Sequence, residues 1–421
     1  MDPITDHNDS SPTPPGENAD AQIWATLTAL TADADGQSIR PENADAVMDP
    51  IIEHFRQTRQ AQALFEAIKW RARWQLGLPL VNIDPDATHD ESTERAIESA
   101  LLDACRQAGT MLIQDGEISQ GWLYLRPTGD VQTARRLLSR LPVTDDNYDD
   151  LIGVLLYEGV DVPRGYRMLL DRQGTCNAIT TFDQAIAARS LDERRAAAAI
   201  LLDSFHAELT DAVKADLQRR ETSFDAAAGL SAWLDRCPDL LAGGYHLDTT
   251  HVQSVTQIAS ILRDRGHVQK ALDLAKYGCR LDAQFRYPGE EPFADFYPSF
   301  VRFYETLLER NVETNLAFFR RKAESADASQ SGTAPLEVYL SLLLAVGQSD
   351  RAIREGIAMV PEETPPTQWT GTLIELADTA ADRHATLYEP ILRYCAQHHD
   401  LLGYAATIRH RDADQIGDSI A

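Results

Sequence analysis

The sequence lacks the features that mark several large classes of protein. Its five cysteines are dispersed over 421 residues and none forms a C-x-x-C pair, a pattern typical of neither a disulfide framework nor a zinc site. No run of 18 apolar residues occurs, so no segment is expected to span a membrane. The N-terminus, which begins Met1-Asp2-Pro3, has neither the basic nor the apolar region of a secretory signal. These absences predict a soluble protein in the reducing environment of the cytoplasm.

Positive charge is also scarce. The 39 basic residues are outnumbered by 65 acidic ones, which gives a formal net charge of −26. Such a chain repels phosphate groups at long range, so neither nucleic acid nor an anionic membrane surface is an expected partner. Basic clusters at 69–74 and 320–322 are interpreted as solvated helix faces whose arginines meet acidic neighbours.

Signatures of catalysis and of cofactor binding are absent from the sequence as well. Nothing resembles a P-loop, a G-x-G-x-x-G turn, an H-E-x-x-H helix or a calcium-binding EF-hand loop. Cys176 has no local signature of a nucleophilic cysteine around it and is expected to be structural. We therefore predict no catalytic residue, no metal site and no cofactor.

What the sequence does contain is a spaced pattern. A leucine is followed four residues later by glycine or asparagine and, five or six residues further on, by a small residue. We expect the leucine to end one amphipathic helix, the glycine or asparagine to take a left-handed cap, and the small residue to let a second helix pack closely. The pattern occurs at Leu125–Gly129–Ala134, Leu262–Gly266–Ala271 and Leu343–Gly347–Ala352, and more loosely at Leu155–Gly159–Gly165 and Leu307–Asn311–Ala317. It predicts antiparallel helix pairs, repeated as in an α-solenoid.

The predicted fold is all-α, because no segment shows convincing period-two alternation of apolar and polar residues. Residues 1–20 are rich in proline, aspartate and serine, which indicates a disordered acidic leader. The rest of the chain is expected to form an N-terminal helical region over 21–115, degenerate helical repeats over 116–245, more regular repeats over 246–410 and a flexible tail over 411–421.

Two stretches resemble a known family. Residues 255–283 are similar to tetratricopeptide (TPR) repeats in helix length, in the turn at Gly266 and in small residues such as Ala271 and Gly278. Residues 339–361 look like a second copy, although the spacing of 81 residues between Gly266 and Gly347 is no multiple of the family's 34. The resemblance implies a TPR-like superhelix that binds peptides or proteins on its surface.

One candidate binding segment precedes a predicted helix near residue 249. It contains Tyr245, His246 and His251, whose offsets do not place the histidines on one helical face and so do not suit a metal site. Asp248 or Thr249 is expected to cap the helix that follows, with His251 in its first turn.

A second candidate lies in an aromatic group at 293–304. Tyr297 and Tyr304 step along one helical face with Phe300. Core packing explains most of this group, and at least one of the two tyrosines is a candidate to line a concave groove as an anchor for a partner.

These observations predict a non-enzymatic scaffold or adaptor that captures a protein or peptide segment through aromatic anchors and arginine side chains. The alternative is an α/α-toroid enzyme that acts on a carbohydrate or another small molecule in a central cavity. The loop carboxylates would then be its catalytic candidates, namely Asp248, Glu290, Glu291 and Asp295. The irregular repeat spacing favours the toroid, and the TPR-like turns favour the scaffold.

Overall fold

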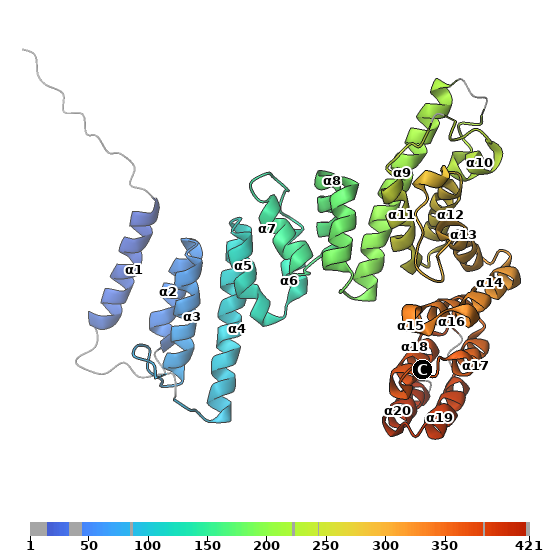
Figure 1. Cartoon of the computed structure of the whole chain (residues 1–421). Coiled ribbons are helices and arrows are strands. Elements are labelled where there is room, and N and C mark those ends of the chain that lie inside the picture. Colours follow the sequence, from blue (N-terminus) through green and yellow to red (C-terminus); the bar gives the residue numbers. More distant parts are fainter. Residues whose placement is uncertain are drawn as a thin grey trace, which may run out of the picture. The chain divides into compact units, whose positions relative to one another are not determined.

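The structure is a computed structural model that describes residues 15–32, 44–84, 87–220, 224–242, 244–381 and 384–417. The described residues form helices α1 to α20 with short 3-10 and π turns and contain no strand, which confirms the all-α prediction (Figure 1). The chain divides into two compact units, residues 1–168 and 169–421, and the division falls within helix α8 (Val162–Thr181). None of the described helices is long and apolar enough to cross a membrane.

The N-terminal unit is a succession of helices that pack mainly on their neighbours along the chain. Its core lies between α2, α3 and α4 and includes Ile52, Leu64 and Ile68. A close helix contact follows, because a Cβ on Gly109 of α4 would lie 2.8 Å from the carbonyl oxygen of Gly121 in α5. The helices are α1 (Pro15–Ala32), α2 (Ala44–Gln57), α3 (Ala61–Gln75), α4 (Glu91–Gln114), α5 (Ile118–Leu125), α6 (Val131–Leu138) and α7 (Tyr148–Ile152).

The C-terminal unit begins within α8, and its first complete helix is the long helix α9 (Leu191–Arg219). Its N-terminus is fixed by a capping box between Ser190 and Glu193. Helix α16 packs on α14 and α17, and helix α18 packs on α17 and α19. The remaining helices are α10 (Gly229–Arg236), α11 (Thr249–Ile258), α12 (Arg265–Cys279), α13 (Phe296–Leu307), α14 (Val312–Ser325), α15 (Ala328–Ser331), α16 (Ala334–Ala345), α17 (Ser349–Met359), α18 (Pro366–Thr379), α19 (Tyr388–Gln397) and α20 (Leu401–Gly417).

The predicted left-handed turns are found at four of the five positions. Gly129, Gly159, Asn311 and Gly347 all have positive φ, between 49° and 83°. The prediction for Gly266 is wrong, because this residue lies inside α12 and its amide is capped by the Asp264 side chain at 3.0 Å. An aspartate two residues earlier satisfies the free amides of the helix, so no left-handed residue is needed there.

The small residues of the pattern are buried as expected at every position but one. Ala134, Ala271 and Ala352 are fully buried, whereas Ala317 is exposed. A Cβ on Gly165 would lie 2.9 Å from the backbone nitrogen of Leu156.

Other boundaries differ from the prediction at the ends of the chain. Helix α1 begins at Pro15, so part of the predicted leader is helical; proline is well tolerated in a first helical turn. Residues 1–14 lie outside the described part. Helix α20 continues to Gly417, so most of the predicted C-terminal tail is helical, and residues 418–421 are again outside the described part.

The segment 181–184 has the threonine and glutamine spacing of a capping box, but no helix starts there. Helix α8 ends at Thr181 in a π turn over Phe182–Ile186, and the long helix that follows starts at Leu191, after the cap residue Ser190. The segment 190–193 has the serine and glutamate of a capping box.

Candidate functional site

The C-terminal unit has a groove of about 510 Å³, which we call the inner groove. Helix α16 lines it with Glu337, Ser341, Leu344 and Ala345. Helix α18 lines it with Thr372, Glu375, Leu376 and Thr379. Steps of three and four residues put each set on one face of its helix. The rest of the lining comes from Leu191 and Arg195 of α9, Arg263 before α12, Leu307 at the end of α13, and Ala381.

Apolar and polar side chains both line the groove. Leu307 and Leu344 are partly exposed there, Leu376 is almost fully buried, and Leu191 is 41% exposed. Apolar side chains that remain accessible in a concave surface are suited to receiving the apolar side chain of a ligand, because burial removes that surface from water.

Two arginines of the lining are held by the same short turn. The Arg195 Nε donates to the carbonyl oxygen of Ile261 at 3.1 Å. A terminal guanidinium nitrogen of Arg263 donates to the carbonyl oxygens of Ser260 at 2.7 Å and Leu262 at 2.9 Å. Backbone carbonyls thus fix both guanidinium groups at one place, the 3-10 turn η5 (Ala259–Ile261) and the residue after it.

No carboxylate neutralises these two arginines among the described residues. Neither Arg195 nor Arg263 forms an ion pair there, although Glu337 and Glu375 line the same groove. Burial and the neighbouring charge of Arg195 lower the pKa of Arg263, while its side chain stays open to solvent. The Arg263 side chain is thus surrounded by protein and still reached by solvent, as expected for a residue in the wall of a groove. The groove therefore has a site where two positive charges lie near each other and neither forms an ion pair in the described part of the chain.

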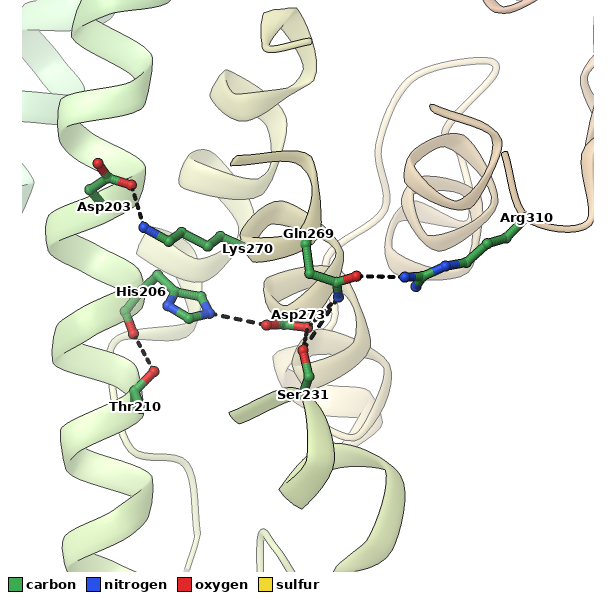
Figure 2. A network of polar contacts seen from close by, with 8 residues as sticks. All are labelled: Asp203, His206, Thr210, Ser231, Gln269, Lys270, Asp273 and Arg310. Atoms are coloured by element: carbon green, nitrogen blue, oxygen red, sulfur yellow. Dashed lines mark hydrogen bonds and ion pairs between the residues drawn. The ribbon is translucent and has the colours of Figure 1, made fainter. Parts of the chain in front are cut away.

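A polar network supports this arrangement by fixing α9 against α12 (Figure 2). Asp273 on α12 is 3% exposed and accepts hydrogen bonds from Ser231 at 2.5 Å and Gln269 at 3.0 Å, and lies 3.1 Å from His206 of α9. Nearer the groove, the Lys270 ammonium lies 2.7 Å from the Asp203 carboxylate. Arg195 belongs to α9 and Arg263 precedes α12. By fixing α9 against α12, the network therefore also sets the distance between the two arginines.

The same network also joins helices outside this pair. Ser231 belongs to α10, and the amide oxygen of Gln269 accepts from Arg310, which precedes α14, at 2.9 Å (Figure 2). A buried carboxylate with several donors is stable only while all of them are in place, so the network holds these elements in one arrangement.

The network is not a catalytic relay. A serine nucleophile is activated by a histidine that lies between it and the acid. Here the acid Asp273 lies between Ser231 and His206, so the serine has no base. The described residues also contain no cluster of histidine, cysteine and acidic side chains with the geometry of a metal site.

The predicted binding segment 245–251 lies elsewhere. Tyr245 is 52% exposed and packs edge-on against Phe285, with the two ring centroids 4.9 Å apart. Asp248 caps α11 and His251 lies in its first turn, which confirms the expected helix start. Neither Tyr245 nor His251 lines the inner groove.

His246 has a structural environment instead. Its Nδ1 lies 3.0 Å from the Tyr277 hydroxyl and its Nε2 3.4 Å from the Asp216 carboxylate. Burial lowers the pKa of His246, and burial raises the pKa of Tyr277 to about 12. Burial would raise the pKa of Asp216, but Arg219, His246 and Arg220 together hold it below its usual value. These groups join α9, α12 and the loop before α11.

The expected exposure of Tyr297 or Tyr304 is not found. Tyr297 is 1% exposed, because its ring fills the space left by the missing side chain of Gly278 on α12. Tyr304 is fully buried and donates to the backbone carbonyl of Thr256. Their helical spacing reflects packing of α13 against α11 and α12.

The four loop carboxylates of the toroid alternative do not converge on the groove. Asp248 caps a helix, Glu291 lies 3.0 Å from the Lys322 ammonium, and Asp295 lines a separate hollow of about 300 Å³ with Tyr297. Neither these nor Glu290 lines the inner groove.

The N-terminal unit has a hollow of its own. It measures about 450 Å³, lies between α2 and α3, and is lined mainly by apolar side chains that include Phe55, Trp70 and Trp74. Its only charged lining residue is Glu66, and no set of polar groups converges there to orient a ligand.

Comparison with known proteins gives no family for this chain: no protein-family model matches it, and neither does any curated protein. The two arginines of the inner groove were not singled out from the sequence. They are 68 positions apart, and only the packing of α9 on the turn before α12 brings them together.

Proposed function

We propose that this protein is a TPR-like helical-repeat scaffold whose C-terminal unit binds a segment of another protein in the inner groove. The groove's construction carries the proposal: single faces of α16 and α18, with the end of α13, provide adjacent strips of accessible leucine and polar side chains. An extended segment fits such a surface because it can contact several helices at once.

Two further features support a TPR-like repeat. Most helices pack on their neighbours along the chain, and left-handed glycine or asparagine residues recur at the turns of the pattern. Small residues such as Ala271, Ala352 and Gly356 lie where helices approach most closely. Both features are expected of stacked antiparallel helix pairs.

The test is a phage-display selection of random peptides on the full chain, followed by binding measurements on groove variants. Ala345→Trp puts a large side chain on an exposed position of the groove, and Ala358→Trp puts it on an exposed position of α17 outside the groove. We expect the first variant to weaken binding of selected peptides at least tenfold and the second to leave it unchanged. Equal binding by both variants would place the binding surface elsewhere and end the proposal.

A further inference from the structure

The inner groove has a charge arrangement that specifies more than a generic protein segment. We infer that the groove recognises a segment with a carboxylate side chain, which binds between Arg195 and Arg263 while an adjacent apolar side chain covers the leucines. This inference rests on the proposed function, because it names the class of segment that the groove accepts.

The first step is the absence of a counter-charge. Several arginines of the C-terminal unit are paired with a carboxylate, as Arg220 is with Asp216 and Arg351 with Glu355. Arg195 and Arg263 are near enough for the charge of one to lower the pKa of the other, and neither has a carboxylate within 4.0 Å among the described residues. Two like charges held together by backbone carbonyls repel each other until an anion binds.

The second step is the chemistry of the donors. Each guanidinium uses part of its five N–H groups on carbonyl oxygens of 260–262, and the others are left for a ligand. Guanidinium groups bind carboxylate and phosphate through parallel hydrogen bonds, which are stronger than bonds between neutral groups. A neutral amide would leave the two positive charges uncompensated.

The third step is the rest of the lining. Glu337 and Glu375 lie on α16 and α18, and neither of these helices carries one of the two arginines. A long run of acidic residues would therefore meet repulsion beyond the arginines. The favoured segment has one acidic group flanked by apolar residues, which contact Leu344 and Leu376.

The experiment uses four pools of randomised nonapeptides that differ only in a fixed central residue: glutamate, phosphoserine, glutamine or lysine. Retention of each pool is measured on the immobilised full chain and on Arg195→Gln, Arg263→Gln and Arg265→Gln variants. Arg265 is exposed and does not line the groove, so it controls for the loss of one positive charge. The Ala345→Trp variant reports whether retention occurs in the groove at all.

We expect the glutamate pool to be retained about tenfold more than the glutamine pool. Stronger retention of the phosphoserine pool than of the glutamate pool would overturn the choice of a carboxylate. The preference for glutamate over glutamine should disappear in the Arg195→Gln and Arg263→Gln variants and persist in Arg265→Gln. If retention depends on Ala345 but shows no preference for glutamate, this inference fails and the proposed function stands. If the Ala345→Trp variant retains every pool like the full chain, the proposed function fails, and the inference fails with it.

Discussion

At the scale of single residues, buried polar groups hold the C-terminal unit in the arrangement that forms the groove. Asp273 is the centre of the network that joins α9, α10 and α12, since three side chains bond to its carboxylate. Removing a buried acceptor leaves its donors without partners and out of reach of water, which costs more than the hydrogen bonds contribute.

We therefore expect Asp273→Ala to lower the free energy of unfolding by about 2–4 kcal/mol. Asp211→Ala is the matched control, because Asp211 is an exposed aspartate on α9 whose side chain forms no hydrogen bond or ion pair with the described residues; its effect should stay within about 0.5 kcal/mol. Urea denaturation of the full chain, followed by circular dichroism, measures both. Equal effects of the two variants would show that the network does not stabilise the fold.

The group around His246 predicts a dependence of stability on pH. Burial lowers the pKa of His246, so the unfolded chain binds a proton that the folded chain does not, and stability falls as the pH drops below the ordinary value of 6.5. The lowered pKa of Asp216 acts in the same direction, but only at pH values near and below 3.8.

Between pH 7 and pH 5, His246 therefore contributes a loss of stability and Asp216 does not. A His246→Gln variant should lose less stability over this range than the unmodified chain, since glutamine does not titrate. Thermal unfolding at both pH values gives the comparison. A larger loss in the variant would mean that the protonated histidine stabilises the fold through Asp216.

At the scale of helices, close packing depends on a few residues without side chains. A Cβ on Gly278 of α12 would lie 2.1–2.5 Å from ring atoms of Tyr297 on α13, and this ring is fully enclosed. We expect Gly278→Ala to destabilise the protein by about 1–3 kcal/mol because the helices must separate or the ring must move.

Gly371→Ala is the control for the helix contact. Gly371 lies in α18, is exposed, and has no atom within 4 Å of the position of a Cβ. Alanine should stabilise the helix there by about 0.5–1 kcal/mol, since it restricts the unfolded chain. Opposite signs for the two variants, measured by chemical denaturation, support the close packing of α12 on α13; the same sign would contradict it.

Much of the helical pattern could be predicted because helix ends are set by local chemistry. The positive φ of Gly129 and Gly347 follows from the freedom of glycine at a helix end. The expected turn at Gly266 failed because the side chain of Asp264 competes for the same amides, and both signals are present in the sequence. The local sequence does not decide whether the glycine takes a left-handed conformation or the aspartate caps the next helix.

The site was harder to predict than the elements. An aromatic step such as Tyr297 to Tyr304 has the same spacing whether it faces a groove or a core, and here it faces the core. No local pattern in the sequence marks Arg195 and Arg263. They stand out only because a tertiary contact brings them to one turn and because neither forms an ion pair with a carboxylate of the described residues. The sequence indicated arginines as binding groups in general, and the fold was needed to choose these two.

At the scale of the whole molecule, the charge of −26 opposes the approach of an acidic ligand at long range. The arginine pair therefore attracts the ligand only at short distance. We expect the overall charge to lower the association rate of the favoured segment more than its affinity. Moderate salt screens the long-range repulsion, so the association rate of the glutamate pool should rise between about 0.02 and 0.15 M salt, as measured by stopped-flow fluorescence. A rate that falls over this range would indicate attraction by the overall field, contrary to the charge balance.

The central claim is that the inner groove of the C-terminal unit is the binding surface. The most direct measurement is photo-crosslinking of the labelled glutamate pool to full chains that carry benzoylphenylalanine in place of Ala345 in the groove or of Ala358 outside it. We expect a yield several-fold higher at position 345, with the excess abolished by Arg263→Gln. Equal yields at the two positions would contradict binding in the groove.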